Sequence, residues 1–295
     1  MNLNQLKYFY AICIYGSLSD TSEYLYISQP SLSSAIKALE NEFGVVLFNR
    51  HHKGMELTSE GKVLFEMCKE IIPRTEQMEN IMKDLGNERK KLRLGVPPMI
   101  ASLILPNIYR DFYKLYPDIT LEIVEDGHNG LLDKLSENYL DMVLLLDNNS
   151  LDKKFVSTKV AELEIVCCTS KDNTIAKYQS VTPRLLKSTP LVLFENTFFK
   201  TEKIKKWFAA EKINPNIILQ TNQLSTMLTM ISSDTAAGFT FRELTKTNET
   251  FVAIPTEIPM YADVNLVWKK DSYCFDSMEK FKKYINEKNP FEAIK

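Results

Sequence analysis

The sequence lacks the features that would place the protein in a membrane or direct it out of the cell. Among its 295 residues no apolar run reaches about 18, so no membrane-spanning helix is expected. The N-terminus, from Met1 to Gln5, has no basic segment followed by an apolar one, and a signal peptide is not predicted. We therefore expect a cytoplasmic protein with no membrane partner.

Paired cysteines, histidines and catalytic motifs are also scarce. The five cysteines are Cys13, Cys68, Cys167, Cys168 and Cys274. Their number is odd and no C-x-x-C occurs, so buried structural thiols are expected rather than disulfides or a zinc site. Only three histidines are present, and no G-x-S-x-G, H-E-x-x-H, P-loop or G-x-G-x-x-G motif occurs. The sequence thus predicts no enzyme activity, no catalytic residues, no metal and no cofactor.

Positive charge is not in excess. The net charge of the chain is −2, and residues 1–60 carry four basic and six acidic side chains, which is again −2. Proteins that bind nucleic acid usually show a basic patch, so a DNA-binding unit in this segment would make few phosphate contacts. The overall composition, 44% hydrophobic and 25% charged, is that of an ordinary globular protein, and the length fits two domains.

Three helices are expected in the first 45 residues. The first carries apolar residues at helical spacing, namely Leu6, Phe9, Tyr10 and Cys13. Gly16 ends this helix, and Ser19 is a candidate N-cap for a second helix that turns Tyr24 and Leu25 inward. After a tight turn, Ser28 can cap a third helix that tolerates Pro30 in its first turn.

The third helix has one apolar face, formed by Leu32, Ile36, Leu39 and Phe43. Its other face is polar, small and nearly uncharged, with Gln29, Ser33 and Lys37 at i, i+4 and i+8. Such a face can enter the major groove, where Gln can read adenine and Ser several bases. Two short helices, a turn and a polar second helix are the helix-turn-helix pattern.

Residues 46–58 predict a β-hairpin, or wing, with Gly54 in its turn. Arg50 and Lys53 would lie near the tip, where they can reach phosphate or the minor groove. The same pattern also fits an all-α subdomain with a hairpin that binds no nucleic acid.

Several motifs in this segment resemble the LysR-type family of transcriptional regulators, in order and in spacing. They are Ser28-Gln29-Pro30-Ser31-Leu32-Ser33, Ile36, Leu39-Glu40, Gly44, Leu47-Phe48, Arg50 and Leu57-Thr58-x-x-Gly61. The resemblance implies a winged helix-turn-helix over residues 1–58 that binds specific double-stranded DNA. With the helix phase, it assigns DNA contacts to Ser28, Gln29, Pro30, Ser31, Ser33, Ser34, Lys37, Arg50 and Lys53.

The sequence departs from the family at three places. Thr21-Ser22 stand where the family usually has two alanines, which implies different packing of the second helix on the third. Ser34 stands where many members carry Arg, and Ala38 where Arg or Lys is common. These departures agree with the low charge and imply weaker DNA binding.

Residues 59–90 predict a linker helix with a seven-residue apolar repeat. Its members are Leu57, Leu64, Ile71, Met78 and Leu85, with Met67 and Ile81 in a second seam. The alternative is an amphipathic helix packed on its own domain. Pro73 predicts a kink, or two helices. In the family this segment dimerises, which implies a homodimer or homotetramer on a palindromic operator with half-sites roughly 34 Å apart.

Residues 91–295 alternate between strand and helix patterns. Strands are expected at 92–96, 119–124, 141–146, 163–168, 191–194, 217–221, 236–241 and 262–269. Helices are expected at 103–116, 130–136, 200–211, 224–232 and 276–288. Repeated β-α units imply an α/β fold with a parallel sheet covered on both faces.

This part of the chain resembles the effector-binding domain of the same family, a two-lobed periplasmic-binding-protein-like (type 2) fold. The matching motifs are Leu92-x-Leu-Gly-Val, Leu105-Pro106, Tyr116-Pro117 and Leu140-Asp141. The resemblance places lobe one at residues 91–161 and 267–295, and lobe two at residues 162–266.

Ligands of open α/β sheets bind beyond the carboxyl ends of the strands, which here places a small-molecule effector between the lobes. The candidate residues are Pro98, Met99, Ile100, His128, Asn129, Asn196, Thr197, Phe198, Thr221, Asn222, Phe239 and Thr240. Several of these loops open a helix, whose free N–H groups favour an anion such as a small carboxylate. Family members often carry Ser or Thr on the first two loops, where this chain has Pro98-Met99 and His128. His128 can sense pH or hold an anion, or be an ordinary hydrogen-bonded loop residue.

The sequence thus predicts a DNA-binding transcription regulator whose activity responds to a small, anionic effector. One alternative is a DNA-binding regulator whose sensor no longer responds. The other is a cytoplasmic solute-binding protein without a DNA function.

Overall fold

In a computed structural model of the protein, residues 1–51, 54–86, 90–146, 151–194, 199–246 and 250–292 are described. The chain forms two compact units, Met1–Leu85 and Gly86–Lys295. The first unit contains α1 (Leu3–Tyr15), α2 (Leu18–Leu25), α3 (Gln29–Phe43), β1 (Phe48–His51), β2 (Gly54–Leu57) and α4 (Ser59–Leu85).

Polar caps and left-handed residues set the ends of the first three helices. Asn2 and Gln5 form a reciprocal capping box at the start of α1, and Gly16 ends this helix at φ 74°. Ser17, rather than the expected Ser19, caps α2, since its side chain accepts the N–H of Asp20. Ser28 caps α3 as expected, and Gly44 ends it at φ 69°.

The helices of the first unit pack around an apolar core. Its buried members are Leu6, Phe9, Ile12, Ile36, Leu39, Leu47, Phe48, Cys68 and Ile72. Two expectations about this core were wrong, because Tyr24 and Phe43 lie exposed near helix ends. The residue of α2 that is buried is Thr21, whose hydroxyl donates to the Ser17 carbonyl at 2.6 Å. This hydrogen bond satisfies the buried Thr21 hydroxyl, a group that the alanine usual in the family at this position does not have.

The wing is an antiparallel pair in which Phe48 faces Leu57 and His51 faces Gly54. The sequence predicted Gly54 to lie in the turn, but this residue lies in β2. Thr58 joins the wing to α4, since its hydroxyl donates to the Val46 carbonyl at 2.7 Å and accepts the N–H of Gly61 at 2.9 Å. These bonds give the Leu57-Thr58-x-x-Gly61 motif a structural role.

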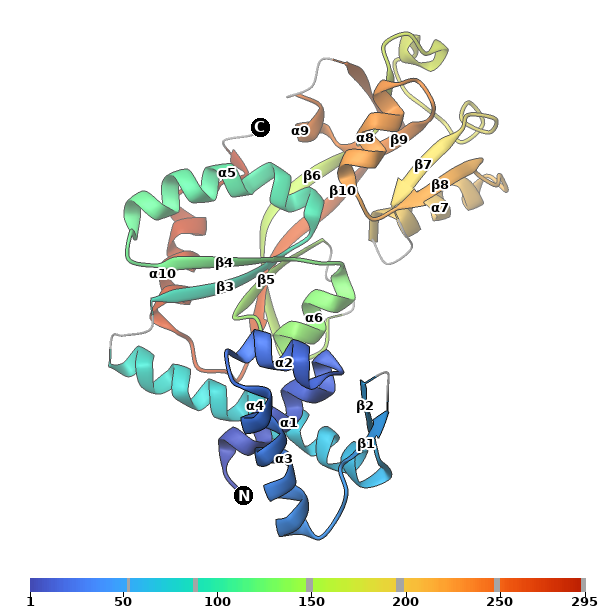
Figure 1. Ribbon diagram of the computed structural model, residues 1–295. Helices are drawn as coiled ribbons and strands as arrows, with labels where there is room; N and C mark the ends of the chain where they lie inside the picture. The colour runs from blue at the N-terminus through green and yellow to red at the C-terminus, as the bar shows by residue number, and fades with distance from the viewer. Residues whose placement is uncertain (52–53, 87–89, 147–150, 195–198, 247–249, 293–295) are drawn as a thin grey trace. The chain divides into compact units, whose positions relative to one another are not determined.

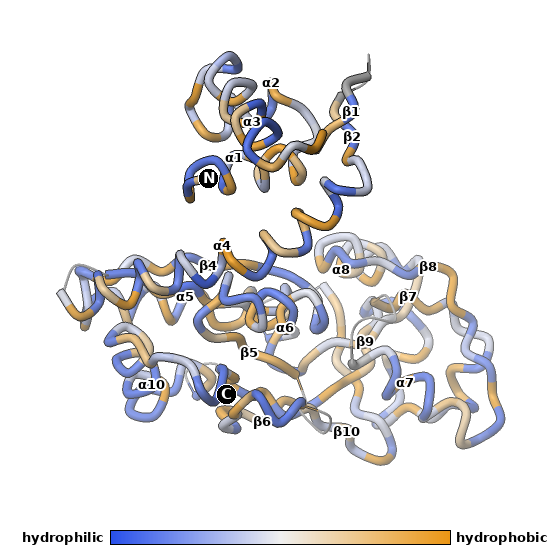
Figure 2. The backbone as a smooth tube through the Cα atoms, turned by 90° about the horizontal axis from the view of Figure 1, so that it is seen from below, coloured by the Kyte–Doolittle hydropathy of each residue, from blue (hydrophilic) through white to orange (hydrophobic). Residues whose placement is uncertain are grey.

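Helix α4 is a single helix with Pro73 inside it, so of the two expected outcomes, a kink or two helices, the second does not occur. Hydrophobic and hydrophilic residues alternate along it (Figure 2). Leu57 and Leu64, the first members of the expected heptad, instead pack on the core of their own unit. The apolar side chains that α4 leaves exposed are Val63, Met67, Ile71, Met78, Met82 and Leu85.

The second unit contains one mixed sheet with helices on both sides. Its strands are β3 (Lys91–Val96), β4 (Thr120–Glu125), β5 (Met142–Leu146), β6 (Phe155–Ser170), β7 (Leu191–Phe194), β8 (Ile217–Thr221), β9 (Ala237–Phe241) and β10 (Phe251–Lys269). Its helices are α5 (Pro98–Leu115), α6 (His128–Ser136), η1 (Thr174–Lys177), α7 (Phe199–Ala210), α8 (Leu224–Ser232), α9 (Arg242–Thr245) and α10 (Asp276–Glu287).

The strand order is β4-β3-β5-β10-β6-β9-β7-β8. Lobe one is built on β3, β4 and β5, and lobe two on β7, β8 and β9. The long strands β6 and β10 run through both lobes (Figure 1). The β-α units pair in parallel as expected, β3 with β4 and β5, and β7 with β8 and β9. The sheet as a whole is nevertheless mixed, because β10 is antiparallel to β5 and β6, and β6 is antiparallel to β9. The chain crosses between the lobes along these strands, which the sequence analysis had cut short.

The C-terminal segment returns to lobe one, as expected from the sequence. Phe112 of α5 packs against Phe281 and Tyr284 of α10, with both ring-centroid distances at 5.4 Å. On β10, residues Val264 to Val267 pair with β5. Within the described residues, no helix combines the length and the apolar character that crossing a bilayer requires.

Candidate DNA-binding face and effector groove

Helix α3 presents the polar face that was expected to read DNA. Gln29, Pro30, Ser34 and Lys37 are exposed, and Ser33 is half-buried. Gln29, Ser33 and Lys37 are spaced at i, i+4 and i+8 along one flank of the stripe formed by the buried Leu32, Ile36 and Leu39, and Pro30 and Ser34 lie on the side away from it. The structure therefore exposes a small, nearly uncharged polar surface on α3.

Ser28 and Ser31 form a local network at the start of α3. The Ser28 side chain accepts the N–H of Ser31, and the two hydroxyl oxygens lie 2.8 Å apart. Both hydroxyls thus help to cap α3. Substitution of either residue would perturb the start of the helix as well as any DNA contact.

The wing places Arg50 in β1, opposite Met55. Lys53, the second wing residue expected to contact DNA, lies outside the described residues. Between α2 and α3, Tyr26 adopts a left-handed conformation at φ 54° and is 95% exposed. The sequence analysis read Tyr26 only as part of a turn.

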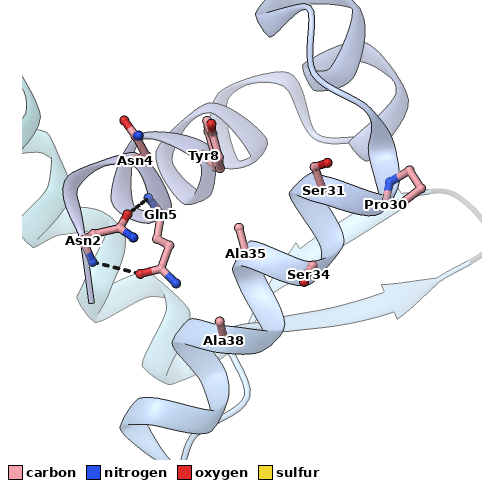
Figure 3. A pocket seen from close by; sticks show the side chains of 9 residues that line it. All are labelled: Asn2, Asn4, Gln5, Tyr8, Pro30, Ser31, Ser34, Ala35 and Ala38. Carbon is pink, nitrogen blue, oxygen red and sulfur yellow. Dashed lines mark hydrogen bonds between the residues drawn. The ribbon is translucent and has the colours of Figure 1, made fainter.

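A groove of about 640 Å³ lies beside the recognition face, between the start of α1 and α3 (Figure 3). Its lining residues are Asn2, Asn4, Gln5, Tyr8, Pro30, Ser31, Ser34, Ala35 and Ala38. The α1 side of this groove was not predicted from the sequence. The signals were the Asn2-x-x-Gln5 capping pattern and the i, i+4 spacing of Asn4 and Tyr8, which put polar groups on one end of a mostly apolar helix.

Two of the candidate effector residues on α5 do not face a site. Met99 is 4% exposed and Ile100 is 0% exposed, so their side chains belong to the core. They were expected in a loop, but Pro97 caps α5 and the helix begins at Pro98. Pro98 lines a groove and stays a candidate.

The candidates Phe239 and Thr240 lie in β9, within the strand expected at 236–241, and both side chains are fully buried. The Phe239 ring packs against Trp207 of α7, at a centroid distance of 6.1 Å. Thr240 is fully buried, and its hydroxyl finds no partner in the described part of the chain.

The start of α6 already holds a carboxylate. The Gly127 N–H donates to the Asp126 carboxylate at 2.7 Å, and a Cβ on Gly130 would meet that carboxylate at 2.4 Å. Lys134 pairs with the other oxygen, and the Lys134 contact holds the pKa of Asp126 below its ordinary value. An effector anion is therefore not expected at this helix end. Next to it, burial lowers the pKa of the half-buried His128, while Asn129 is exposed.

The start of α8 is open by comparison. Its N-cap Gln223 makes no side-chain cap, and the Gln223 N–H donates to the Thr221 hydroxyl at 3.1 Å. A groove of about 720 Å³ runs between this helix end and α5. It is lined by Pro98, Ala101, Ser102, Leu105, Pro106, Glu125, Asn222, Gln223, Leu224, Ser225 and Leu228.

This groove unites Pro98 of lobe one with Asn222 of lobe two, which the sequence analysis had proposed together. It adds Ser102, Glu125 and Ser225, which were not predicted from the sequence, and it includes Gln223 of the same candidate loop as Asn222. Asn196, Thr197 and Phe198 lie outside the described residues. Free backbone N–H groups at α8 and the Glu125 carboxylate can together bind a small molecule that carries both an acceptor and a donor.

The thiols behave as structural groups. Cys68, Cys167 and Cys168 are buried, and Cys13 and Cys274 are half-buried. Burial raises the pKa of Cys68 to about 11 and that of Cys13 to about 12, which keeps both thiols protonated and unreactive. Within the described residues, no group of three His, Cys, Asp or Glu side chains is placed to hold a metal ion.

A winged helix-turn-helix unit joined to a two-lobed α/β domain defines a class of protein, the transcription regulators that couple DNA binding to a small molecule. Two family models match the chain. "Bacterial regulatory helix-turn-helix protein, lysR family" covers residues 3–62, and "LysR substrate binding domain" covers residues 85–290. The protein belongs to the LysR family of transcription regulators.

Curated relatives agree over nearly the whole chain. The "Uncharacterized HTH-type transcriptional regulator YwbI" of Bacillus subtilis strain 168 is 28% identical over 279 residues, which covers 92% of each chain. The "HTH-type transcriptional regulator CzcR" of Bacillus anthracis is 27% identical and covers 97% of this chain and 98% of its own. These relatives are named as regulators, and the prediction that the protein is not an enzyme is confirmed.

The fold matches a solved regulator. Full-length CbnR in complex with its target DNA has a TM-score of 0.72 and 17% identity, with 97% of this chain and 99% of CbnR covered. The expected fold, a winged helix-turn-helix with a two-lobed effector domain, is thereby confirmed. The protein is a DNA-binding regulator with an effector domain.

Proposed function

We propose that the protein reads a two-fold-symmetric operator through the exposed face of α3, and that a small effector bound between the two lobes alters its DNA occupancy. The observation that carries this proposal is the polar, nearly uncharged face of α3, with Gln29 and Lys37 exposed on it. An amide can pair bidentately with adenine, and small serines let the helix backbone approach the base edges. Arg50 and Lys53 of the wing would add the few phosphate contacts.

For the effector we propose a small molecule with an anionic group. The open start of α8 supports it, since Thr221 and Asn222 flank backbone N–H groups that have no helical acceptor. The carboxylate of Asp126 at the start of α6 disfavours an anion there, so the α8 end is the better position. Glu125 in the same groove favours an effector that also carries a hydrogen-bond donor.

We further propose that the protein acts in the cytoplasm. Support comes from its family, since a regulator of transcription must reach chromosomal DNA. Residues 1–58 would serve as the DNA-binding domain, 59–90 as the dimerisation helix, and 91–295 as the effector domain.

A fluorescence anisotropy titration of the full-length protein tests the DNA reading. The probes are a duplex from the region upstream of its own gene and a scrambled duplex, each at two salt concentrations. Gln29→Ala should cut the preference for the native duplex by about 1–3 kcal/mol and leave binding to the scrambled duplex unchanged. Gln179→Ala, which removes the same exposed amide in the other unit, should change neither. If Gln29→Ala keeps the full preference, α3 is not the reading element.

The effector proposal is tested on the same complex with a panel of mono- and dicarboxylates. A carboxylate that shifts operator affinity, and loses this effect in Asn222→Asp, supports an anion at the start of α8. If no carboxylate shifts DNA affinity or the unfolding temperature, the regulator with a non-responsive sensor becomes the better account.

A further inference from the structure

The groove between α1 and α3 is lined only by uncharged side chains, which separates it from an ordinary charged DNA-binding surface. Figure 3 shows its two walls: Asn4, Gln5 and Tyr8 lie along α1, opposite Ser34 and Ala38 on α3. An occupant that touches both walls would meet amides and a phenol on one side and a bare helix surface on the other.

The α1 wall is rich in hydrogen-bond donors. The Asn2 side-chain oxygen accepts the N–H of Gln5 at 2.9 Å, and the Gln5 side-chain oxygen accepts the N–H of Asn2 at 2.8 Å. Because the capping box uses the two amide oxygens, the NH₂ groups of both side chains remain as donors. The N–H groups of Leu3 and Asn4 also lack helical acceptors, and the positive end of the 13-residue α1 dipole lies here.

The α3 wall is low. Ala35 and Ala38 carry nothing beyond Cβ, and Ser31 and Ser34 are nearly as small. Pro30, Ser31 and Ser34 line this groove and also belong to the surface proposed to contact DNA. The groove is therefore continuous with the recognition face, so DNA bound by that face would extend toward it.

We propose that the groove holds the sugar–phosphate backbone of the operator strand beside the recognition face, with Asn4, Gln5 and Tyr8 donating hydrogen bonds to its phosphates. This inference rests on the proposed reading of DNA by α3. Phosphate oxygens only accept hydrogen bonds, and the α1 wall supplies neutral donors and a helix N-terminus that suit them. Among the described residues that line the groove, none carries a carboxylate that would repel an anion.

Neutral donors explain how a unit with net charge −2 over residues 1–60 can hold a polyanion. A neutral amide or phenol adds binding free energy without neutralising a phosphate, so it releases no counterion. The affinity that this groove contributes is therefore independent of salt, unlike that of a lysine or arginine contact.

The loss-of-contact test compares Tyr8→Phe and Asn4→Ala with the wild-type protein in the anisotropy assay. Each variant should weaken binding to the native and the scrambled duplex by the same factor, roughly 2- to 10-fold for one neutral hydrogen bond, at an unchanged salt slope. Tyr178→Phe, at an exposed tyrosine of the other unit, is the matched control and should bind as the wild type does.

Single methylphosphonates along the native duplex then locate the contact. In the wild-type protein one or two substitutions flanking the α3 site should weaken binding, and Tyr8→Phe or Asn4→Ala should lose sensitivity at one of them. If Tyr8→Phe and Asn4→Ala both keep the wild-type affinity and the wild-type methylphosphonate profile, the proposal for the groove is overturned. This holds even when Gln29→Ala loses its preference for the native duplex, which would still support the reading of DNA by α3. A wild-type protein that binds neither duplex would overturn the proposed reading of DNA together with the groove.

A variant that adds a phosphate contact should change DNA affinity in the opposite direction. Ala38→Lys places a cation on the exposed α3 wall, and it should tighten binding to both duplexes and steepen the salt slope by about 1. Gln179→Lys adds the same charge outside the DNA-binding unit and should leave the slope unchanged. An equal response of the two lysine variants would mean that no phosphate lies in the groove.

Discussion

At the scale of single residues, His128 gives the second unit a dependence on pH. Burial lowers its pKa, so between the folded and unfolded pKa values the unfolded chain binds the extra proton. This contribution to stability is complete above about pH 6.5 and is lost as the pH falls toward the folded pKa. The free energy of unfolding should therefore fall with acidification below about pH 6.5, and His128→Gln should flatten that slope.

Tryptophan fluorescence during urea unfolding measures this slope, because both tryptophans, Trp207 and Trp268, lie in the second unit. His51→Gln, in the first unit, is the control and should keep the wild-type slope. Asp126 and Glu164, whose pKa values are lowered by Lys134 and Arg242, titrate at lower pH and do not obscure the effect. An identical slope in His128→Gln would contradict the assignment.

Asp141 anchors β3 to the start of β5. Its carboxylate is 1% exposed and binds the Arg93 guanidinium at 2.7 Å and the Arg93 N–H at 2.8 Å. Asp141→Ala leaves a mostly buried guanidinium without this partner, which should cost about 3 kcal/mol in the fluorescence-monitored unfolding. Asp118→Ala removes a carboxylate from the exposed pair with Lys90 and should cost less than about 1 kcal/mol. Equal losses in the two variants would contradict this account.

At this scale the sequence predicted the positions of the α3 residues better than those of the effector candidates, and the roles of both sets stay predictions. Ser28 and Gln29 follow from helix phase and capping, which are local. Met99 was misplaced because α5 begins at Pro98, before the expected helix start at residue 103, and helix ends depend on tertiary packing. Phe239 lies in a strand that was expected, but the pattern did not show that its ring packs on Trp207. Apolar residues that recur every two or 3.6 residues show which face of a strand or helix is buried, but they do not show at which residue the element begins.

At the scale of elements, the joint between the wing and α4 depends on Gly61. A Cβ at this position would meet the Leu47 carbonyl oxygen at 2.2 Å and Leu57 Cδ2 at 2.9 Å. Gly61→Ala should therefore destabilise the first unit by about 1–3 kcal/mol, despite the better helix propensity of alanine.

Far-ultraviolet circular dichroism follows this unit, which contains no tryptophan, and the fluorescence transition of the second unit should not move. Lys62→Ala, an exposed neighbour in α4, is the control and should change stability by less than about 0.5 kcal/mol. A first unit of wild-type stability in Gly61→Ala would show that the wing can shift to accept the methyl group.

The elements most poorly predicted were the two longest strands. The sequence pattern limited them to 163–168 and 262–269, whereas β6 and β10 span Phe155–Ser170 and Phe251–Lys269. Their outer parts carry Lys159, Glu162, Pro255 and Glu257, which read as loop. Pairing of each strand with the other stabilises these parts, and such long-range pairing is not encoded in local propensity.

At the scale of the whole molecule, the exposed apolar side chains of α4 bear on oligomerisation. We expect Met78→Lys with Met82→Lys to lower the oligomeric state, because two charges would be buried wherever this stripe meets its equivalent in a second copy. Light scattering after size-exclusion chromatography measures the mass. Glu70→Lys, an exposed change on the same helix, should retain the wild-type mass. A double variant of wild-type mass would place the interface elsewhere.

The position of β10 in the sheet has a consequence for how the protein is made. This strand lies between β5 and β6, yet it is among the last elements to leave the ribosome. The DNA-binding unit, complete by Leu85, can fold during synthesis. The effector domain must wait with unpaired edges on β5 and β6 until Lys269 has emerged. Any shortage of chaperones should therefore deplete the sensor first and leave the half that binds DNA correctly folded.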